Sequence, residues 1–361
     1  MRIVQVVEST ATGTLSMVSL IANRFAAAGH EVHVIYSARP DTPAALHALF
    51  GPRVTLRCLP MRGRALFVTL VALRRALIAL DPQVVHLHSS FAGFAGRLAT
   101  LGALRDAALF YSPHCIAFMR RDVSRAMRVA FVALERIACM RACRYVACSD
   151  SERDAVRSRL RQAVAVVENA VEPLPAARWP RRACDAARPL DVVTVGGVRP
   201  QKDPHLFAEI AQRLRGDAMR FTWIGDGSAS HADALRAAGV EVTGWRARAD
   251  VLRRLADADV YLSTSAWEGM PVSVIEAMSA GVAVVATRCS GNVDALAHLR
   301  TGLLFRDADE AIACLRALRR NRALCARLGR AARAVARARF APARFIAELE
   351  RLYRDGSGLR D

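Results

Sequence analysis

The chain has 361 residues and a formal net charge of +19. This length is sufficient for two domains with their own cores, and an apolar content of 53% excludes a largely disordered chain. The charge favours anionic surroundings such as phospholipid head groups, nucleotides or nucleic acid without choosing among them. Nine cysteines with no CxxC pair indicate buried thiols in a reducing compartment rather than a metal site.

The N-terminal residues predict a buried strand at Ile3–Val7 directly after Met1 and Arg2, and no signal peptide. Further along, residues 65–80 are apolar but too short, and too charged at Arg74 and Arg75, to span a bilayer. We expect an amphipathic surface helix there. Docking on an anionic bilayer is the alternative. Its basis is Arg62 and Arg64 together with the apolar positions Leu66, Leu70, Leu73 and Leu77.

Short β-rich runs alternate with longer amphipathic stretches in both halves of the chain, which predicts βαβ units and parallel sheets. After the first strand, the expected strands of the first half are Glu31–Ser37, Val54–Leu59, Gln83–His88, Ala108–Ser112, Arg144–Cys148 and Val164–Val167. Those of the second half are Leu190–Val195, Met219–Ile224, Val240–Thr243, Val260–Ser263 and Val282–Thr287. The prediction is an α/β protein with two doubly wound, Rossmann-like domains that face a central cleft, with ligands at the carboxyl ends of the strands.

The expected domain boundaries follow from a stretch that has neither helical nor strand periodicity. Residues 173–189 are rich in Pro, Arg and Ala and are predicted to be a linker. Residues 1–172 and 190–340 form the two domains. Residues 341–361 contain a final helix, about Pro342 to Asp355, which we expect to pack back toward the first domain through apolar positions at helical spacing. These positions are Phe345, Ile346, Leu349 and Leu352.

Lys202 is the single lysine of a chain with 52 lysine and arginine residues. It follows the predicted strand Leu190–Val195. Lysine carries a compact, mobile point charge, whereas arginine carries a rigid planar fork, so the two do not interchange at a crowded phosphate. Lys202 is therefore a candidate phosphate ligand, and chance survival of one lysine is the alternative.

Two carboxylates bracket one predicted helix start in the segment Trp267–Met278. Pro271 suits the first turn of a helix, so Glu268 lies before that helix and Glu276 inside it. Free amides and the helix dipole attract phosphate at such a terminus, and carboxylates accept hydrogen bonds from sugar hydroxyls. Glu276 stands in a nearly all-apolar run, where a buried charge needs a polar partner, and a ribose diol would serve.

This segment resembles the E-x7-E signature of glycosyltransferase family 4, which comprises retaining nucleotide-sugar glycosyltransferases with the GT-B fold. The resemblance covers nearly the whole chain. It implies that Glu268 contacts the donor sugar, that Glu276 holds the ribose and that Lys202 binds phosphate. It also implies contacts of backbone amides with the sugar and the diphosphate, at Met270, Pro271 and Val272.

The family's second phosphate-binding cation, an arginine, would align with Gly197. Side chains at positions i and i+2 of an extended segment share a face, so we expect Arg199 to take its place. Lys202, Arg199, Glu268 and His114 are thus the predicted catalytic residues.

Other segments resemble the family's ligand contacts. Gly225 lies in a turn similar to the one that contacts the nucleotide. Trp245 lies in a segment similar to the loop that packs on the base, with a structural aromatic as the alternative. Gly13 resembles the second glycine of a turn near the acceptor or the diphosphate, and His114 resembles a histidine near the donor sugar. His86 and His88 are expected to be packing residues.

We predict no metal and no other cofactor. Asp257–Asp259 and Asp307–Asp309 resemble a DxD motif, but the first leads into a buried strand and the second starts a helix, where Asp caps naturally. Lys202, Arg199 and a helix terminus remain for the charge of the leaving group. The resemblance implies front-face transfer with retention.

The expected partners are a nucleotide-sugar donor and a lipid-linked glycan or sugar acceptor of cell-surface polysaccharide biosynthesis. With an anionic membrane surface as a further partner, the expected location is cytoplasmic, on the inner face of the cell membrane. Nucleic acid is not expected, because the arginines are spread without interleaved stacking aromatics. Two alternatives stay open: another GT-B enzyme such as a sugar-nucleotide epimerase, and a non-catalytic protein that binds anions or membranes.

Overall fold

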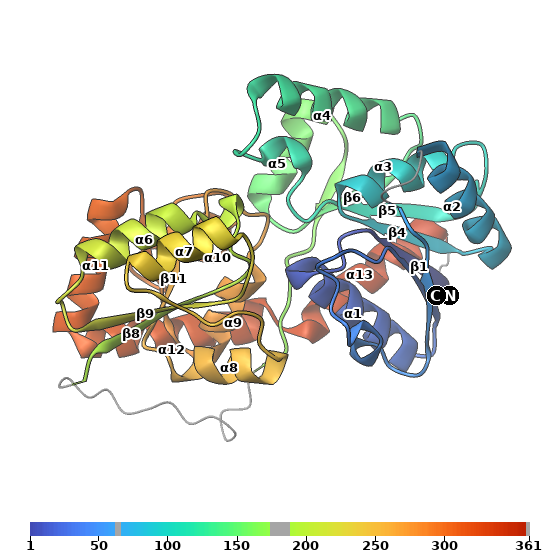
Figure 1. The fold of residues 1–361 in the computed structure, drawn as a ribbon. Helices are drawn as coiled ribbons and strands as arrows, with labels where there is room; N and C mark the ends of the chain where they lie inside the picture. The colour runs from blue at the N-terminus through green and yellow to red at the C-terminus, as the bar shows by residue number, and fades with distance from the viewer. Residues whose placement is uncertain (62–65, 174–187, 359–361) are drawn as a thin grey trace. The chain divides into compact units, whose positions relative to one another are not determined.

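A computed structural model describes residues 1–61, 66–173 and 188–358 (Figure 1). The chain divides into two compact units. The first comprises Met1–Asn169 and Pro342–Asp361, and the second comprises Ala170–Ala341. Most of the expected linker, like Arg62, Arg64 and Ala65, lies outside the described residues.

The first unit is built on a seven-stranded parallel sheet of order β3-β2-β1-β4-β5-β6-β7. Its strands are β1 (Arg2–Val7), β2 (Glu31–Tyr36), β3 (Val54–Cys58), β4 (Val84–His88), β5 (Ala108–Ser112), β6 (Arg144–Ala147) and β7 (Val164–Val166). Its helices are α1 (Thr12–Ala27), α2 (Leu66–Leu80), α3 (Ser90–Ala99), α4 (Arg125–Ala138), α5 (Asp150–Leu160) and α13 (Pro342–Ser357), with 3-10 turns η1 (Leu46–Leu49) and η2 (Ala117–Met119). The strand order reverses between β1 and β4, so the carboxyl ends of these two strands flank the crevice where such sheets bind ligands.

The C-terminal helix α13 is part of the first unit and packs on α1 and β5 (Figure 1). Phe345, Leu349 and Tyr353 form its buried face. The hydroxyl of Tyr353 lies 2.6 Å from Nδ1 of His86 on β4. The last helix of the chain thus completes the core that surrounds the central strands.

The second unit contains a six-stranded parallel sheet of order β10-β9-β8-β11-β12-β13. Its strands are β8 (Leu190–Val195), β9 (Met219–Ile224), β10 (Glu241–Val242), β11 (Val260–Ser263), β12 (Ala283–Thr287) and β13 (Leu303–Phe305). Its helices are α6 (Pro204–Arg213), α7 (Ala229–Ala237), α8 (Arg248–Asp257), α9 (Val272–Ala280), α10 (Asn292–Ala295), α11 (Ala308–Arg320) and α12 (Arg322–Arg339), with the 3-10 turn η3 (Pro200–Lys202). Here the order reverses between β8 and β11, the two strands that precede Lys202 and Glu268. The doubly wound α/β prediction is confirmed for both units.

The segment with the bilayer alternative forms helix α2, which buries one side on the first unit. Leu73 and Leu77 are fully buried in the core of the first unit, whereas Leu66 is 41% exposed and Leu70 is half-buried. Contact of α2 with a bilayer therefore stays an alternative that the fold does not decide. Within the described residues, no helix combines the length and the apolar character needed to cross a membrane.

Candidate active site

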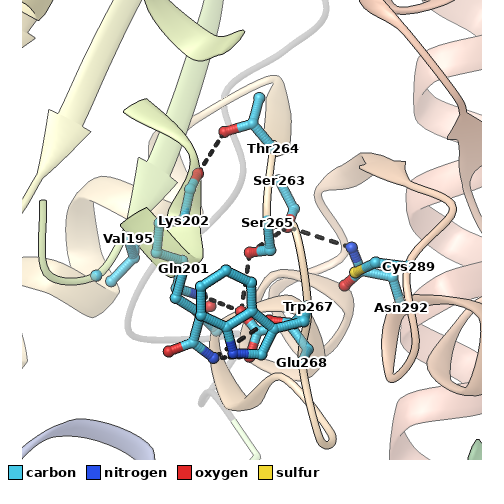
Figure 2. Close-up of polar contacts among 12 residues, drawn as sticks. Val195, Gln201, Lys202, Ser263, Thr264, Ser265, Trp267, Glu268, Cys289 and Asn292 are labelled. Atoms are coloured by element: carbon cyan, nitrogen blue, oxygen red, sulfur yellow. Dashed lines mark hydrogen bonds and ion pairs between the residues drawn. The ribbon is translucent and has the colours of Figure 1, made fainter. Parts of the chain in front are cut away.

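Lys202 and Glu268 meet where β8 and β11 end (Figure 2). Lys202 closes the turn η3, and its carbonyl accepts a hydrogen bond from Thr264 Oγ1 at 2.7 Å. Its Nζ donates to Glu268 Oε1 at 2.8 Å. Gly196 makes room for the lysine stem: a Cβ at this position, where φ is +143°, would lie 3.1 Å from Lys202 Cε.

Two neighbours that the sequence analysis missed fix the Glu268 carboxylate. Ser265 Oγ donates to Oε1 at 2.8 Å, and Gln201 Nε2 donates to Oε2 at 3.2 Å and to the Trp267 carbonyl at 3.2 Å (Figure 2). Both could have been suspected from their closeness in sequence to the predicted site residues, because Gln201 directly precedes Lys202 and Ser265 lies three residues before Glu268. Because both oxygens have donors, the carboxylate is held in one orientation.

The residue that packs behind Glu268 must be a glycine. Gly291 has φ +80°, and a Cβ there would lie 2.7 Å from the Gly269 carbonyl and 2.8 Å from Glu268 Cβ. Any side chain at this position would displace the Glu268–Gly269 backbone.

Lys202 is buried but remains a cation. Burial disfavours the ammonium form, yet the carboxylate of Glu268 and its hydrogen bond outweigh that cost, so the pKa of Lys202 is raised above its ordinary value. A buried ammonium group of this kind is not a base. It is a fixed positive charge that suits an anionic ligand.

The N-terminus of α9 lies directly after Glu268 in the chain. Pro271 is the N-cap, with φ −74° and ψ 107°, and the helix begins at Val272. The prediction of Pro271 inside the first turn is therefore off by one residue, because its ψ is extended rather than helical. The first backbone amides of a helix have no intrahelical acceptor, so those that follow Met270 and Pro271 suit a phosphate or a sugar oxygen.

Glu276, inside α9, is buried and pairs with Arg248 at the start of α8. Arg248 Nη2 donates to Glu276 Oε1. Burial opposes the charge of Arg248, but the Glu276 carboxylate outweighs it and raises the arginine pKa. The need for a polar partner was predictable, but the identity of that partner was not. Among the described residues, no hydrogen bond joins Glu276 to Lys202 or to Glu268.

Arg199 lies against the glycine that replaces the family's arginine. Its Cδ and Nε are 3.8 and 3.9 Å from the position that a Cβ on Gly197 would occupy. The side chain is exposed, so its guanidinium is available to a ligand. This geometry is the one expected from the shared face of positions 197 and 199.

The remaining predicted ligand contacts have different surroundings. A Cβ on Gly225 would lie 2.1 Å from the Gly196 carbonyl, so the neighbouring backbone leaves no room for a side chain here. Trp245 is 61% exposed, so it is not a core aromatic. Gly13 lies in the first turn of α1 rather than in the loop before it.

In the first unit, His114 follows β5 in a left-handed backbone conformation, with φ +53°. His114 Nε2 lies 3.0 Å from His88 Nδ1, and His88 Nε2 lies 2.6 Å from Gln5 Oε1. Because the amide oxygen of Gln5 accepts from His88, the Nδ1 of His88 must accept from His114, which leaves the lone pair of His114 on Nδ1. Burial lowers the pKa of His114 to about 4, so the ring is neutral at physiological pH. His86 and His88 are fully buried, as expected for packing residues, but both also take part in hydrogen bonds within the core.

A buried carboxylate that the sequence analysis missed holds the backbone beside His114. Glu152 Oε1 accepts from the amides of Cys115 and Ile116 at 2.7 and 3.0 Å, and Oε2 accepts from the amide of Cys148 at 2.9 Å. These bonds tie the segment after β5 to the end of β6.

Two family models match the chain: one described as Glycosyltransferase Family 4 over residues 12–173, and one described as Glycosyl transferases group 1 over residues 189–321. The chain belongs to glycosyltransferase family 4.

Relatives within this group include two bacterial transferases. An Escherichia coli UDP-Gal:alpha-D-GlcNAc-diphosphoundecaprenol alpha-1,3-galactosyltransferase is 26% identical over 62% of this chain and 62% of its own length. A Campylobacter jejuni N,N'-diacetylbacillosaminyl-diphospho-undecaprenol alpha-1,3-N-acetylgalactosaminyltransferase is 34% identical over 27% of this chain and 26% of its own. The chain therefore spans less than two thirds of the length of either relative.

A solved structure confirms the GT-B fold. The Anabaena protein Alr3699/HepE in complex with UDP and glucose superposes with a TM-score of 0.80 at 16% identity, over 98% of this chain and 100% of that one.

The DxD-like acids of this family 4 chain have structural partners. Asp259 lies 2.6 Å from Arg188 Nη2 and accepts from the Asp191 amide at 2.9 Å, and Asp307 caps α11. Asp309 pairs with Arg213. Over the residues that the structure describes, no cluster of three or more His, Cys, Asp or Glu side chains could hold a metal ion.

Proposed function

We propose that this chain transfers a sugar from a nucleotide-sugar donor to a lipid-linked glycan acceptor in surface-polysaccharide biosynthesis, with retention of anomeric configuration and without a metal ion. The observation that carries the proposal is the contact of Lys202 with Glu268 immediately before the N-terminus of α9. This contact brings together the Lys202 cation, which suits a diphosphate, and the Glu268 carboxylate, which can accept from sugar hydroxyls. Both lie next to the free amides at the start of α9. Support for the acceptor class comes from the two relatives whose names contain diphospho-undecaprenol acceptors.

The reaction places growing negative charge where this site has positive charge. As the bond from the anomeric carbon to the diphosphate oxygen breaks, Lys202 and the α9 amides stabilise the departing diphosphate more than they stabilise the bound donor. The acceptor hydroxyl oxygen forms its bond to the anomeric carbon on the same face. Its proton passes to the departing phosphate oxygen, so no enzyme nucleophile takes part.

Metal independence rests on the same charges. Lys202 and Arg199 supply two cations near the end of β8, and the DxD-like acids already have arginine or helix partners. We expect turnover to continue in excess EDTA. Loss of turnover in EDTA, with recovery on added Mg²⁺, would contradict this part of the proposal.

The proposed place of action is the cytoplasmic face of the cell membrane, where α4 offers a surface. Five apolar side chains on or next to this helix are exposed: Met127, Val129, Leu134, Ile137 and Met140. Arg121, which precedes α4, and Arg125, its first residue, are exposed as well. Exposed apolar side chains next to cations suit an anionic bilayer. Val129→Asp should reduce co-sedimentation with phosphatidylglycerol vesicles, whereas Phe67→Asp on α2 should not. Equal binding to phosphatidylcholine and phosphatidylglycerol vesicles would argue against the charge component.

The decisive experiment is product analysis. The protein is incubated with UDP-, GDP- and ADP-sugars, with and without a sugar-diphospho-undecaprenol acceptor, and products are separated by mass and by anomeric configuration. The proposal predicts an acceptor-dependent glycoside whose anomeric configuration matches the donor. A changed sugar nucleotide without acceptor would indicate an epimerase instead. Binding of nucleotides without any product in either arm would contradict catalysis.

A further inference from the structure

Glu276, the carboxylate that the family resemblance assigns to the ribose, has a hydrogen-bonding partner of its own. Glu276 is 4% exposed at its side chain, and Arg248 Nη2 donates to its Oε1. An arginine therefore holds the hydrogen-bonding position that a ribose hydroxyl would need. A buried carboxylate without a partner is costly, so the ion pair stabilises Glu276 in its buried position.

Arg248 is placed so that it can leave. Its side chain is 54% exposed, in contrast to that of its partner. It is the first residue of α8, whose N-cap Ala247 makes no side-chain cap. A cation at a helix N-terminus is disfavoured by the helix dipole, so helix formation gives no reason for an arginine here. The preceding residues from Trp245 onward are exposed as well, so few contacts oppose its movement.

We propose that Arg248 is a displaceable partner of Glu276 that selects for ribonucleotides. This inference rests on the proposed function of Glu276. In the donor-free protein Arg248 neutralises the buried carboxylate, and a nucleotide completes its binding only by replacing the guanidinium with its own ribose hydroxyls. A vicinal diol supplies two O–H donors to one carboxylate and can make that exchange. A nucleotide without these hydroxyls cannot, so it must bind with the ion pair intact and without the contact to Glu276.

The sign of one substitution tests this mechanism. In Arg248→Ala, Glu276 has lost its competitor, so a ribonucleotide should bind more tightly, by roughly fivefold for a half-exposed ion pair. General electrostatics predicts the opposite, because the variant removes a positive charge near an anionic ligand. Tighter binding therefore cannot come from charge alone.

The measurement is calorimetric titration with UDP, GDP and ADP, and the tightest of the three is then compared with its 2′,3′-dideoxy analogue. Arg248→Ala should tighten the ribonucleotide, leave the dideoxynucleotide unchanged, and lower the melting temperature of the ligand-free protein. Arg246→Ala is the matched control, since it removes an exposed arginine from the same segment; it should not tighten binding. Weaker or unchanged ribonucleotide binding in Arg248→Ala, or equal tightening of both nucleotides, would overturn the inference.

A second variant separates this inference from the proposed function. In Arg248→Ala/Glu276→Gln, an uncharged amide with a single acceptor oxygen replaces the carboxylate that would accept from both hydroxyls, so the gain seen in Arg248→Ala should disappear and binding should fall below wild type. If the double variant binds the ribonucleotide as tightly as Arg248→Ala, Glu276 does not hold the ribose, and the assignment itself fails. If Arg248→Ala does not tighten binding but the double variant still binds more weakly than wild type, Glu276 holds the ribose and Arg248 is not displaced by it.

Discussion

Lys202 Nζ and Glu268 Oε1 form a 2.8 Å hydrogen bond although the two residues are 66 positions apart in the chain. The bond is possible because β8 and β11 are adjacent and parallel, so the loops after them leave the same edge of the sheet. Because both groups are buried, this hydrogen bond holds the ammonium group of Lys202 in one position. The site is therefore arranged for charge before a ligand arrives, as electrostatic catalysis requires.

Replacing Lys202 by alanine should remove a preorganised cation from the departing diphosphate. We expect kcat/KM to fall by ~10²–10³, or about 3–4 kcal/mol in the barrier, by analogy with the loss of one oxyanion donor. Glu268 keeps its bonds from Ser265 and Gln201, so the fold of the loop should persist. Steady-state kinetics with saturating acceptor measure the effect.

Lys202→Arg is the matched control, since it keeps the charge. The turn beside Gly196 is tight around the lysine stem, and a planar guanidinium has a different shape, so this variant should recover little of the lost activity. Near-wild-type turnover in Lys202→Arg would mean that only the charge matters, and near-wild-type turnover in Lys202→Ala would remove Lys202 from the mechanism.

Arg199→Ala tests whether this exposed side chain replaces the missing family arginine. It should weaken binding of a nucleoside diphosphate, and binding of the corresponding nucleoside should not change, because the lost contact is with phosphate. Isothermal titration with UDP and uridine distinguishes the two. Arg199→Ala/Gly197→Arg is the complementary variant: the arginine returns at the family's position, and recovered UDP affinity would support the shared location. Unchanged UDP affinity in Arg199→Ala would refute it.

The positions of Lys202 and Glu268 at strand ends were predictable, because alternating strand and helix patterns fix where parallel strands end. Their direct contact was not predictable, since it depends on which strands are neighbours. The short strand β13, Leu303–Phe305, was missed, whereas the equally short β7, Val164–Val166, was predicted.

Polar partners from distant segments were the main omission. Arg248 lies 28 residues before Glu276, and the hydroxyl of Tyr353 lies 267 residues from its partner His86. Nothing in the local pattern of either residue points to the other. For Glu276, burial predicted that a partner must exist, and only the tertiary structure identifies it.

The buried histidines predict how stability depends on pH. Burial lowers the pKa of His114 to about 4 and that of His86 to about 3, and it lowers that of His88 well below 6.5. In the unfolded chain these rings take up protons near pH 6.5, whereas in the folded protein they do not. The unfolded state therefore binds more protons, and the free energy of unfolding should fall as the pH drops from about 6.5 toward about 4.

Urea unfolding at pH 7, 6 and 5 measures this slope. His88→Gln keeps an amide between Gln5 and His114 but cannot titrate, so its stability should fall less steeply over the same range. An unchanged slope in His88→Gln would show that this histidine is not kept neutral by burial.

The fully buried ion pair of the first unit gives the clearest stability prediction. Arg97 Nη2 donates to Glu135 Oε2 at 2.5 Å and Nη1 donates to the Tyr145 hydroxyl at 2.7 Å, while the Tyr111 hydroxyl donates to Glu135 Oε1 at 3.0 Å. The guanidinium lies 4.6 Å above the Tyr111 ring. Removing either charge alone leaves the other buried without its counter-ion.

Glu135→Gln should therefore lower the free energy of unfolding by about 3–5 kcal/mol, as for other broken buried pairs. Asp122→Asn is the control in the same unit: its 2.6 Å pair with Arg120 is 23–44% exposed, so its loss should cost less than about 1 kcal/mol. The double variant Arg97→Met/Glu135→Leu should be more stable than Glu135→Gln, because it removes both buried charges and keeps the volume apolar. Urea midpoints at pH 7 rank the three. If Glu135→Gln were no more costly than Asp122→Asn, the arginine would be finding water or another acceptor, and the cluster of Arg97, Glu135 and the two tyrosines would not be a closed polar core.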